Sequence, residues 1–183
     1  MAKETLTFVL DLTYFRAYIY DEFTHRLNMK IKVLPKPQDW DKVMIRMALV
    51  ISTMSKDPST KVGAILVSPD RTRISVGYNG FPRQIPDLEK WWKNRGDDEN
   101  EFSKYELVRH AEMNAITQAK TDLADWTLYV THHPCLDCAK HIVAEGITRV
   151  VYHLDPDQII MSINHRKIKK LFKIAHIAFK QLN

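Results

Sequence analysis

The sequence has few of the residues on which several protein classes depend. Among its 183 residues there are only two cysteines, three positions apart, so the fold cannot depend on a network of disulfide bonds. Five glycines exclude a collagen-like fibre, and a hydrophobic fraction of 45% is too high for a disordered chain. No uncharged apolar run approaches the roughly 20 residues of a membrane span, and charged residues interrupt the N-terminus where a signal peptide would lie. We therefore expect a globular, cytoplasmic protein that does not enter membranes.

Positive charge is concentrated at the C-terminal end of the chain. The net charge is +5, yet residues 158–183 hold six Lys or Arg and no Asp or Glu, so residues 1–157 carry a net charge of −1. A surface for nucleic acid or phosphate is one interpretation. The other is the solvated face of an amphipathic helix, because apolar residues recur at helical spacing among the basic ones. These apolar residues are Ile160, Ile163, Ile168, Leu171, Phe172 and Ala175.

The order of the predicted elements favours a layered α/β domain. Residues 1–34 form an N-terminal extension of unknown role, and residues 35–183 form the main domain after the break at Pro35–Lys36–Pro37. A helix is predicted from its N-cap Asp39 to Asp57–Pro58. The elements predicted after it are a hairpin over 61–68 and 73–77, an excursion over 82–106, a helix over 109–120, a strand over 127–131, a helix over 135–145, a strand over 149–153, the basic helix and a strand over 176–179. This order predicts a three-layer α/β/α sandwich with a central mixed sheet of about five strands.

Two short motifs predict a metal site. His110–Ala111–Glu112 begins one helix, and Cys135 and Cys138 open the next, so the two helix starts can lie side by side. Zn²⁺ binds catalytic Cys₂His sets and keeps the fourth tetrahedral position for water, while a helix N-terminus favours thiolates. Glu112 is placed to move the protons of that water rather than to bind the ion. The joint pattern, H-x-E with P-C-x-x-C, is that of zinc nucleobase deaminases.

Two other interpretations of the cysteine pair are weaker. A redox pair expects a thioredoxin-like context and has no use for the histidine and glutamate. A structural zinc site has four protein ligands and no need of Glu112. The candidates for its fourth ligand are His132, His133 and His141. We therefore predict one catalytic zinc per chain, held by His110, Cys135 and Cys138.

The motifs resemble those of the cytidine/deoxycytidylate deaminase superfamily, and within it those of the deoxycytidylate (dCMP) deaminases. Residues 110–116 and 134–140 carry the superfamily resemblance. The narrower resemblance rests on the strings SKDPSTKVGA, GYNGFP, GI and VVY, at residues 55–64, 77–82, 146–147 and 150–152. It extends from Pro35 to the C-terminus, and it implies the cytidine deaminase-like form of the predicted fold.

The resemblance implies hydrolytic deamination of dCMP to dUMP with release of ammonia, a reaction that feeds thymidylate synthesis. Zinc-bound hydroxide is the implied nucleophile and Glu112 the implied proton shuttle. By the same analogy, the backbone N–H of Ala111 holds the base carbonyl, and the backbone carbonyl of His133 accepts from the amine. The alternative substrate is a base in tRNA or single-stranded DNA, which only the basic C-terminal helix supports. The chain lacks an evident arm of alternating aromatic and basic residues, which disfavours nucleic acid as a partner.

Four more residues are candidates for binding the nucleotide. Asn79 comes before Gly80 in a turn, where the resemblance implies a sugar contact, although Asn-Gly is also an ordinary turn pair. Thr60 and Lys61 are placed to meet a phosphate, and the alternative for Lys61 is a solvent-facing position. Tyr152 either packs near the base or belongs to the core.

The resemblance also implies regulation at a second site. Many members are homohexamers that dCTP activates and dTTP inhibits with Mg²⁺, at a site between subunits. The candidate residues are Gly80, Phe81 and Arg83, in the turn before the long excursion, whereas Trp91–Trp92 is more typical of loop packing. We therefore expect dCTP and dTTP as regulatory ligands, Mg²⁺ with the regulatory nucleotide, and a homohexamer.

Overall fold

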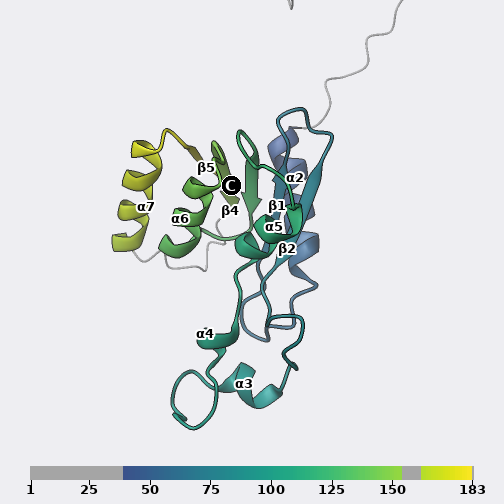
Figure 1. Cartoon of the computed structure of the whole chain (residues 1–183), viewed down its shortest axis with the longest axis vertical. Coiled ribbons are helices and arrows are strands. Elements are labelled where there is room, and N and C mark those ends of the chain that lie inside the picture. Colours follow the sequence, from purple (N-terminus) through teal and green to yellow (C-terminus); the bar gives the residue numbers. More distant parts are fainter. Residues whose placement is uncertain (1–38, 154–161, 183) are drawn as a thin grey trace, which may run out of the picture. The chain divides into compact units, whose positions relative to one another are not determined.

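The structure is a computed structural model that describes residues 39–153 and 162–182, so the predicted extension over residues 1–34 lies outside the described residues. The residues from Gln38 onward belong to one compact unit. Its elements, labelled in Figure 1, are α2 (Trp40–Ser52), β1 (Gly63–Val67), β2 (Ile74–Tyr78), α3 (Glu89–Lys93), α4 (Lys104–Leu107), α5 (Ala111–Ala119), β3 (Thr127–Val130), α6 (Leu136–Ala144), β4 (Arg149–His153), α7 (Ser162–Ile174) and β5 (Ala178–Leu182).

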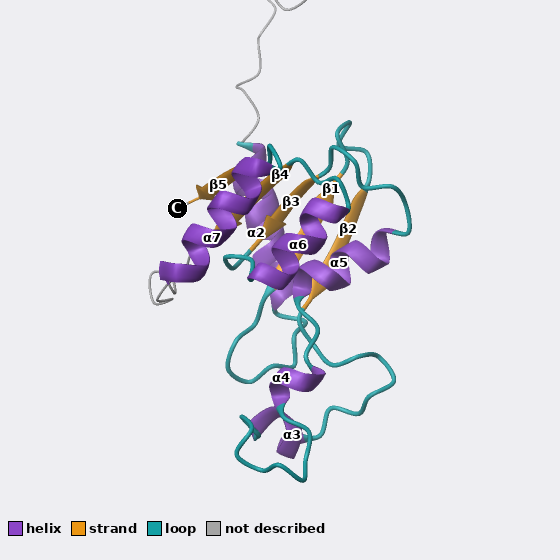
Figure 2. Cartoon of the chain, turned by 60° about the vertical axis from the view of Figure 1, so that its left-hand side comes forward, coloured by secondary structure: helices purple, strands orange, loops and turns teal. Residues whose placement is uncertain are grey.

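The five strands form one mixed sheet in the order β2-β1-β3-β4-β5 (Figure 2). Strand β1 pairs antiparallel with β2 and β3, whereas β3, β4 and β5 run parallel. A short turn suffices to connect β1 to β2, while α6 and α7 provide the crossovers that parallel neighbours require. The carboxyl ends of β2, β3 and β4 consequently lie at one edge of the sheet, where open α/β sheets bind their ligands.

Helices cover both faces of the sheet. On one face α2 packs its buried Met44, Ile45 and Ala48 against β1, β3 and β4. On the other face α5, α6 and α7 lie side by side and bury a larger cluster that includes Ile142 and Phe172 (Figure 2). The predicted three-layer sandwich with five strands is therefore confirmed.

Two glycines allow the helices to approach the sheet closely. A Cβ atom on Gly63 would collide with the backbone of α2 at Ala48, and one on Gly77 would collide with the backbone of α5 at Ala111. A larger residue at either position would push a helix away from its strand. Since α5 follows His110 and carries Glu112, Gly77 helps to set the position of these two residues.

The first helix begins as predicted but ends earlier. The side chain of Asp39 accepts a hydrogen bond from the N–H of Asp41 at 3.0 Å, which confirms the predicted N-cap. Helix α2 ends at Ser52 rather than at Asp57–Pro58. The Asp57 carboxylate instead accepts from the N–H groups of Ser59 and Thr60, a local bonding pattern that competes with helix.

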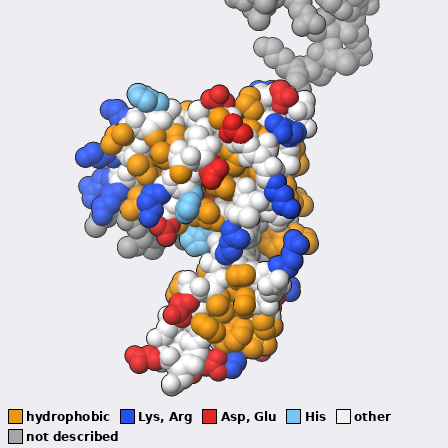
Figure 3. Space-filling model, in the orientation of Figure 1, with side chains coloured by type: hydrophobic (Ala, Val, Ile, Leu, Met, Phe, Trp, Pro, Cys, Tyr) orange, Lys and Arg blue, Asp and Glu red, His pale blue; other side chains and the backbone are white. Residues whose placement is uncertain are grey.

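The described part of the basic segment is an amphipathic helix. Ile168 and Phe172 of α7 are buried, and the five basic residues of this helix are exposed. Figure 3 shows Lys and Arg side chains gathered over α7. Ile160 lies outside the described residues. Within the described ranges, no helix has both the length and the apolar character needed to cross a membrane.

The long excursion forms a lobe over residues 82–108 that extends away from the sheet (Figure 1). It contains two short helices, α3 and α4, where the sequence predicts one at most. Phe81 stacks on Trp92 of the lobe, with ring centroids 3.9 Å apart. Lys104 forms a buried ion pair of 2.7 Å with Asp57. These two contacts attach the lobe to the loop and turn at the carboxyl edge of the sheet.

Candidate active site

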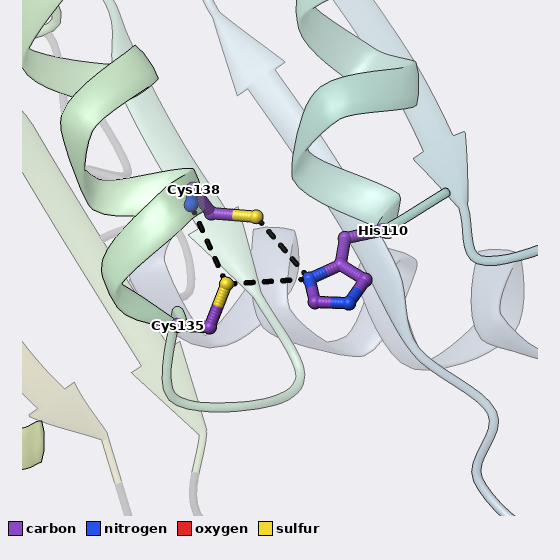
Figure 4. A group of neighbouring side chains, drawn as sticks. All are labelled: His110, Cys135 and Cys138. Carbon is purple, nitrogen blue, oxygen red and sulfur yellow. Dashed lines mark hydrogen bonds between the residues drawn. The ribbon is translucent and has the colours of Figure 1, made fainter. Parts of the chain in front are cut away.

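Two helix starts bring the predicted metal ligands together at the carboxyl edge of the sheet. His110 is the residue before α5, and Cys135 is the residue before α6, so both side chains stand at helix N-termini. Cys138 lies in the first turn of α6 and faces the same point (Figure 4). The Sγ atom of Cys135 accepts a hydrogen bond from the N–H of Cys138 at 3.4 Å, which holds the pair in this arrangement.

The spacing of the three donor atoms fits a zinc ion. The Nδ1 atom of His110 lies 3.4 Å from the Sγ atom of Cys135 and 3.4 Å from that of Cys138. All three atoms lie within 4.8 Å of one another. Tetrahedral zinc with ordinary Zn–N and Zn–S bonds places nitrogen and sulfur about 3.6 Å apart. A cation at their centre therefore requires only small movements of the side chains.

The protonation states of the thiols also suit a cation. Hydrogen bonds from Cys138 and His110 lower the pKa of Cys135 to about 4, so this side chain is a thiolate at neutral pH. The hydrogen bond to Cys135, together with burial, raises the pKa of Cys138. Two adjacent thiolates repel each other, so both can ionise only when a positive ion lies between them.

Glu112 is the buried acid of the site. It lies in the first turn of α5 and is 3% exposed. Burial raises the pKa of its carboxyl group, and the neighbouring His110 acts in the opposite direction. Its carboxyl group also interacts with Cys138. A carboxyl group so placed can accept a proton beside the ligand cluster and release it again.

The backbone groups predicted to bind the base lie next to the ligands. Ala111 is the first residue of α5, and the first N–H groups of a helix have no acceptor within the helix. His133 precedes Pro134 and Cys135, and its ring Nδ1 lies 2.8 Å from the carbonyl oxygen of Pro134. Its Nε2 lies 2.7 Å from Nδ1 of His165, at the start of α7. These two contacts hold the His133 ring in place. They therefore also fix the position of the His133 backbone, including the carbonyl group predicted to accept from the amine.

The structure places Asn79 in an internal network. Its Nδ2 group donates to Asp57 at 3.1 Å and to the carbonyl of Thr60 at 2.9 Å, and its Oδ1 atom accepts from the N–H of Val62 at 2.8 Å. Both amide hydrogens are therefore used, while Oδ1 keeps room for a second donor. Thr60 and Lys61 are exposed on the loop that Asn79 holds.

Tyr152 is placed in the core. It is 2% exposed, and its ring lies against His133 and Phe179, with centroid distances of 5.1 Å and 4.6 Å. Its hydroxyl group donates to Gln181 at 3.3 Å. This environment favours the core alternative for Tyr152 and leaves it behind the His133 loop.

The predicted regulatory residues line a separate cavity. Gly80, Phe81 and Arg83 border a cavity of about 480 Å³ between the turn and α5. Three further basic residues line it: Lys56, Arg109 and Lys120. Gly80 pairs with Arg109, and Arg109 directly precedes His110. The backbone of these residues therefore connects the cavity to the candidate metal site.

Sequence reasoning missed two cations of the lobe that reach the loop at the sheet edge. Lys104 and Arg95 donate to the Oγ atom of Ser59 at 3.1 Å and 2.9 Å. Neither lies in a motif or near Ser59 along the chain, so no local pattern marks them. Only the docking of the lobe brings them there.

Comparisons with known proteins agree with this site. The sequence profile described as "Cytidine and deoxycytidylate deaminase zinc-binding region" matches residues 38–154, a range that contains His110, Glu112, Cys135 and Cys138. A "Probable deoxycytidylate deaminase" of Caenorhabditis elegans is 37% identical over 139 residues, covering 75% of this chain and 67% of the relative. The "Deoxycytidylate deaminase" of Mus musculus is 32% identical over 144 residues, covering 78% of this chain and 79% of the relative.

A solved structure shares the fold. The dCMP deaminase of cyanophage S-TIM5, determined in complex with dCMP and dUMP, superposes with a TM-score of 0.60. The alignment covers 81% of this chain and 100% of the phage chain, at 22% identity. At that identity the likeness supports the architecture of the sandwich.

Proposed function

Because the chain belongs to the cytidine and deoxycytidylate deaminase family, we propose that it catalyses the hydrolytic deamination of dCMP to dUMP with release of ammonia. The observation that carries this proposal is the Cys₂His cluster with a buried glutamate beside it. The deoxycytidylate deaminases among the relatives support dCMP as the substrate.

The donor set of His110, Cys135 and Cys138 is the one expected to hold the zinc. A bound zinc ion supplies Lewis acidity and makes water a nucleophile at neutral pH. With three protein ligands, a catalytic zinc keeps one position open for that water. We propose one such zinc per chain.

Glu112 moves the protons in this proposal. Its carboxylate takes one proton from the attacking water and delivers it to the ring nitrogen beside the reacting carbon, while the water oxygen bonds to that carbon. It then transfers the second proton to the amino group, the carbon–nitrogen bond breaks, and ammonia leaves as the carbonyl forms. Burial supports this role, since a raised pKa lets the carboxyl group hold a proton between the two steps.

Groups around Glu112 orient the nucleotide. The N–H of Ala111 donates to the base carbonyl, and the carbonyl of His133 accepts from the amine. The free acceptor position on Oδ1 of Asn79 takes the 3′-hydroxyl of the sugar as a donor. Thr60 and Lys61 lie on the same loop as candidates for the phosphate, and Tyr152 supports the His133 loop from behind.

Parallel assays with dCMP, dCTP, cytidine and single-stranded DNA test the substrate. The zinc-loaded protein is expected to show a kcat/KM for dCMP at least about 100-fold above that for cytidine, because a site built for a polar group discriminates strongly against analogues that lack it. The larger dCTP and single-stranded DNA should also be poorer substrates than dCMP. Release of dUMP and ammonia, followed by chromatography and a coupled assay, measures the rate. A preference for cytosine in DNA would contradict the proposal. It would indicate instead that the basic face of α7 binds the nucleic acid.

We also propose that the cavity beside Arg83 binds regulatory triphosphates, with dCTP as activator and dTTP with Mg²⁺ as inhibitor, in a homohexamer. Four basic residues and Asp87 line the cavity; Lys56 is paired with Asp87, and the other three basic residues suit a triphosphate. The pairing of Gly80 with Arg109 links the cavity to His110. A cytoplasmic location is part of the proposal, since two cysteine ligands need a reducing compartment to remain thiols.

Replacing Arg83 by alanine is expected to remove the response to both triphosphates while dCMP turnover persists. In the unsubstituted protein, each effector should shift the half-saturating dCMP concentration by about 5- to 150-fold, the usual range of coupling between sites. Titrations of dCMP with and without each triphosphate in Mg²⁺, with oligomer mass from light scattering, make the measurement. Arg73→Ala, at the opposite edge of the sheet, is the control. A monomer that neither triphosphate affects would contradict the regulatory proposal.

A further inference from the structure

The loop over residues 57–61 is built rigidly at the carboxyl edge of the sheet. The buried carboxylate of Asp57 accepts from the N–H groups of Ser59 and Thr60 at 2.9 Å and 3.1 Å. Its other oxygen atom accepts from the Asn79 side chain at 3.1 Å and from Lys104 at 2.7 Å. One carboxylate thus joins Ser59 to Asn79, and it fixes the distance between them.

Arg95 of the lobe reaches this loop and is held there before any ligand binds. One guanidinium nitrogen donates to the Ser59 hydroxyl at 2.9 Å, and the other donates to the Tyr105 hydroxyl at 2.8 Å. The guanidinium carbon also lies 5.7 Å from the centre of the Tyr105 ring. Both partners are neutral, and no ion pair within the described residues includes Arg95. Its charge therefore remains uncompensated and exposed.

The charge around Ser59 is positive. Lys104 also donates to the Ser59 hydroxyl at 3.1 Å, and Lys61 is exposed two residues away. Against these three cations the loop carries a single carboxylate, that of Asp57. By contrast, the nearby Lys56 is paired with Asp87 at 2.6 Å. A cluster with excess positive charge, next to the Tyr105 hydroxyl, suits an anionic oxygen ligand such as a phosphate.

The cluster lies beside the residue proposed to bind the sugar. The Asp57 carboxylate accepts hydrogen bonds from both the Asn79 amide and the Ser59 hydroxyl, so one side chain bridges the two residues. A sugar on Asn79 with its base toward Glu112 would direct the phosphate at Arg95. Arg95 is better suited than Lys61 to receive it, because a guanidinium held by two hydrogen bonds is already oriented, whereas a solvent-exposed ammonium must be ordered on binding.

The Ser59 hydroxyl donates to the Asp57 carboxylate at 3.0 Å, so it orients Arg95 and has no hydrogen left for a ligand. We propose that Arg95, together with the hydroxyl group of Tyr105, binds the 5′-phosphate of the substrate and so selects the nucleotide over the nucleoside. This inference rests on the proposed deamination of dCMP and identifies the residue that recognises the phosphate. It assigns the lobe over residues 82–108 a function, since the lobe brings the phosphate-binding cation to the edge of the sheet.

Replacing Arg95 by methionine tests the assignment, because it removes the charge and keeps most of the side-chain stem. The kcat/KM for dCMP is expected to fall by roughly 10- to 100-fold, chiefly through KM, as expected when hydrogen bonds to a charged group are lost. The kcat/KM for deoxycytidine, which has no phosphate, should stay within about twofold. Arg73→Met is the matched control, since Arg73 also bonds a hydroxyl group, that of Thr121, and lies over an aromatic ring, that of Trp126.

Product binding separates this inference from the proposed function. Calorimetry with dUMP and deoxyuridine is expected to show that Arg95→Met weakens dUMP binding by roughly 10- to 100-fold and leaves deoxyuridine unchanged. An inactive wild-type protein would contradict the proposed deamination, yet this binding difference would still support the phosphate site. Equal losses for dUMP and deoxyuridine, or no loss for either, would overturn the assignment of Arg95.

Discussion

The Glu112→Gln variant is expected to lose at least about 100-fold in kcat for dCMP while it keeps its zinc and its fold. Glutamine has nearly the same shape as glutamate, so it preserves the packing of a side chain that is only 3% exposed. It cannot, however, accept a proton from water and pass it on. Steady-state kinetics, zinc analysis and thermal unfolding of the same preparation make the measurement.

The control for Glu112→Gln is Glu145→Gln, which changes an exposed glutamate at the end of α6. It should retain full activity. Turnover within a few-fold of the wild type in the Glu112 variant would refute its role in proton transfer. A simultaneous loss of zinc would instead show that Glu112 belongs to the metal's ligands.

Replacing Cys138 by alanine is expected to abolish stoichiometric zinc binding, and with it turnover. The remaining His110 and Cys135 would provide two ligands, too few for the three protein ligands that a catalytic zinc site has. Metal analysis after gel filtration should fall from about one zinc per chain to a small fraction of that. Asp137→Ala removes the neighbouring carboxylate, which is 81% exposed and paired with Lys140, and should keep its zinc. Full occupancy in the Cys138 variant would show that the ion is held elsewhere.

Much of the candidate site could be predicted from the sequence because its parts are local. Whether a residue opens a helix depends on its near neighbours, so His110 and Cys135 could be placed at helix starts from their surroundings alone. The affinity of imidazole and thiolate for zinc is a property of those side chains in any fold. The layers could be predicted for a related reason, since buried faces leave a period in the sequence, as with Ile168 and Phe172 in α7.

Other features of the site depend on contacts between residues that are distant in the sequence, and only the tertiary structure determines them. The bond between Ser59 and Arg95 spans 36 positions, and the one between Asn79 and Asp57 spans 22. Such pairs leave no period or motif in the chain, because each residue is polar and its partner is determined by how the lobe packs. The sequence predicted a sugar contact for Asn79, but only the packing shows that both of its amide hydrogens are used inside the protein, which leaves Oδ1 for that contact. Short strings of residues thus predicted the metal-binding chemistry, whereas only the packing of the lobe on the sheet edge places Arg95, the cation that we propose to bind the phosphate.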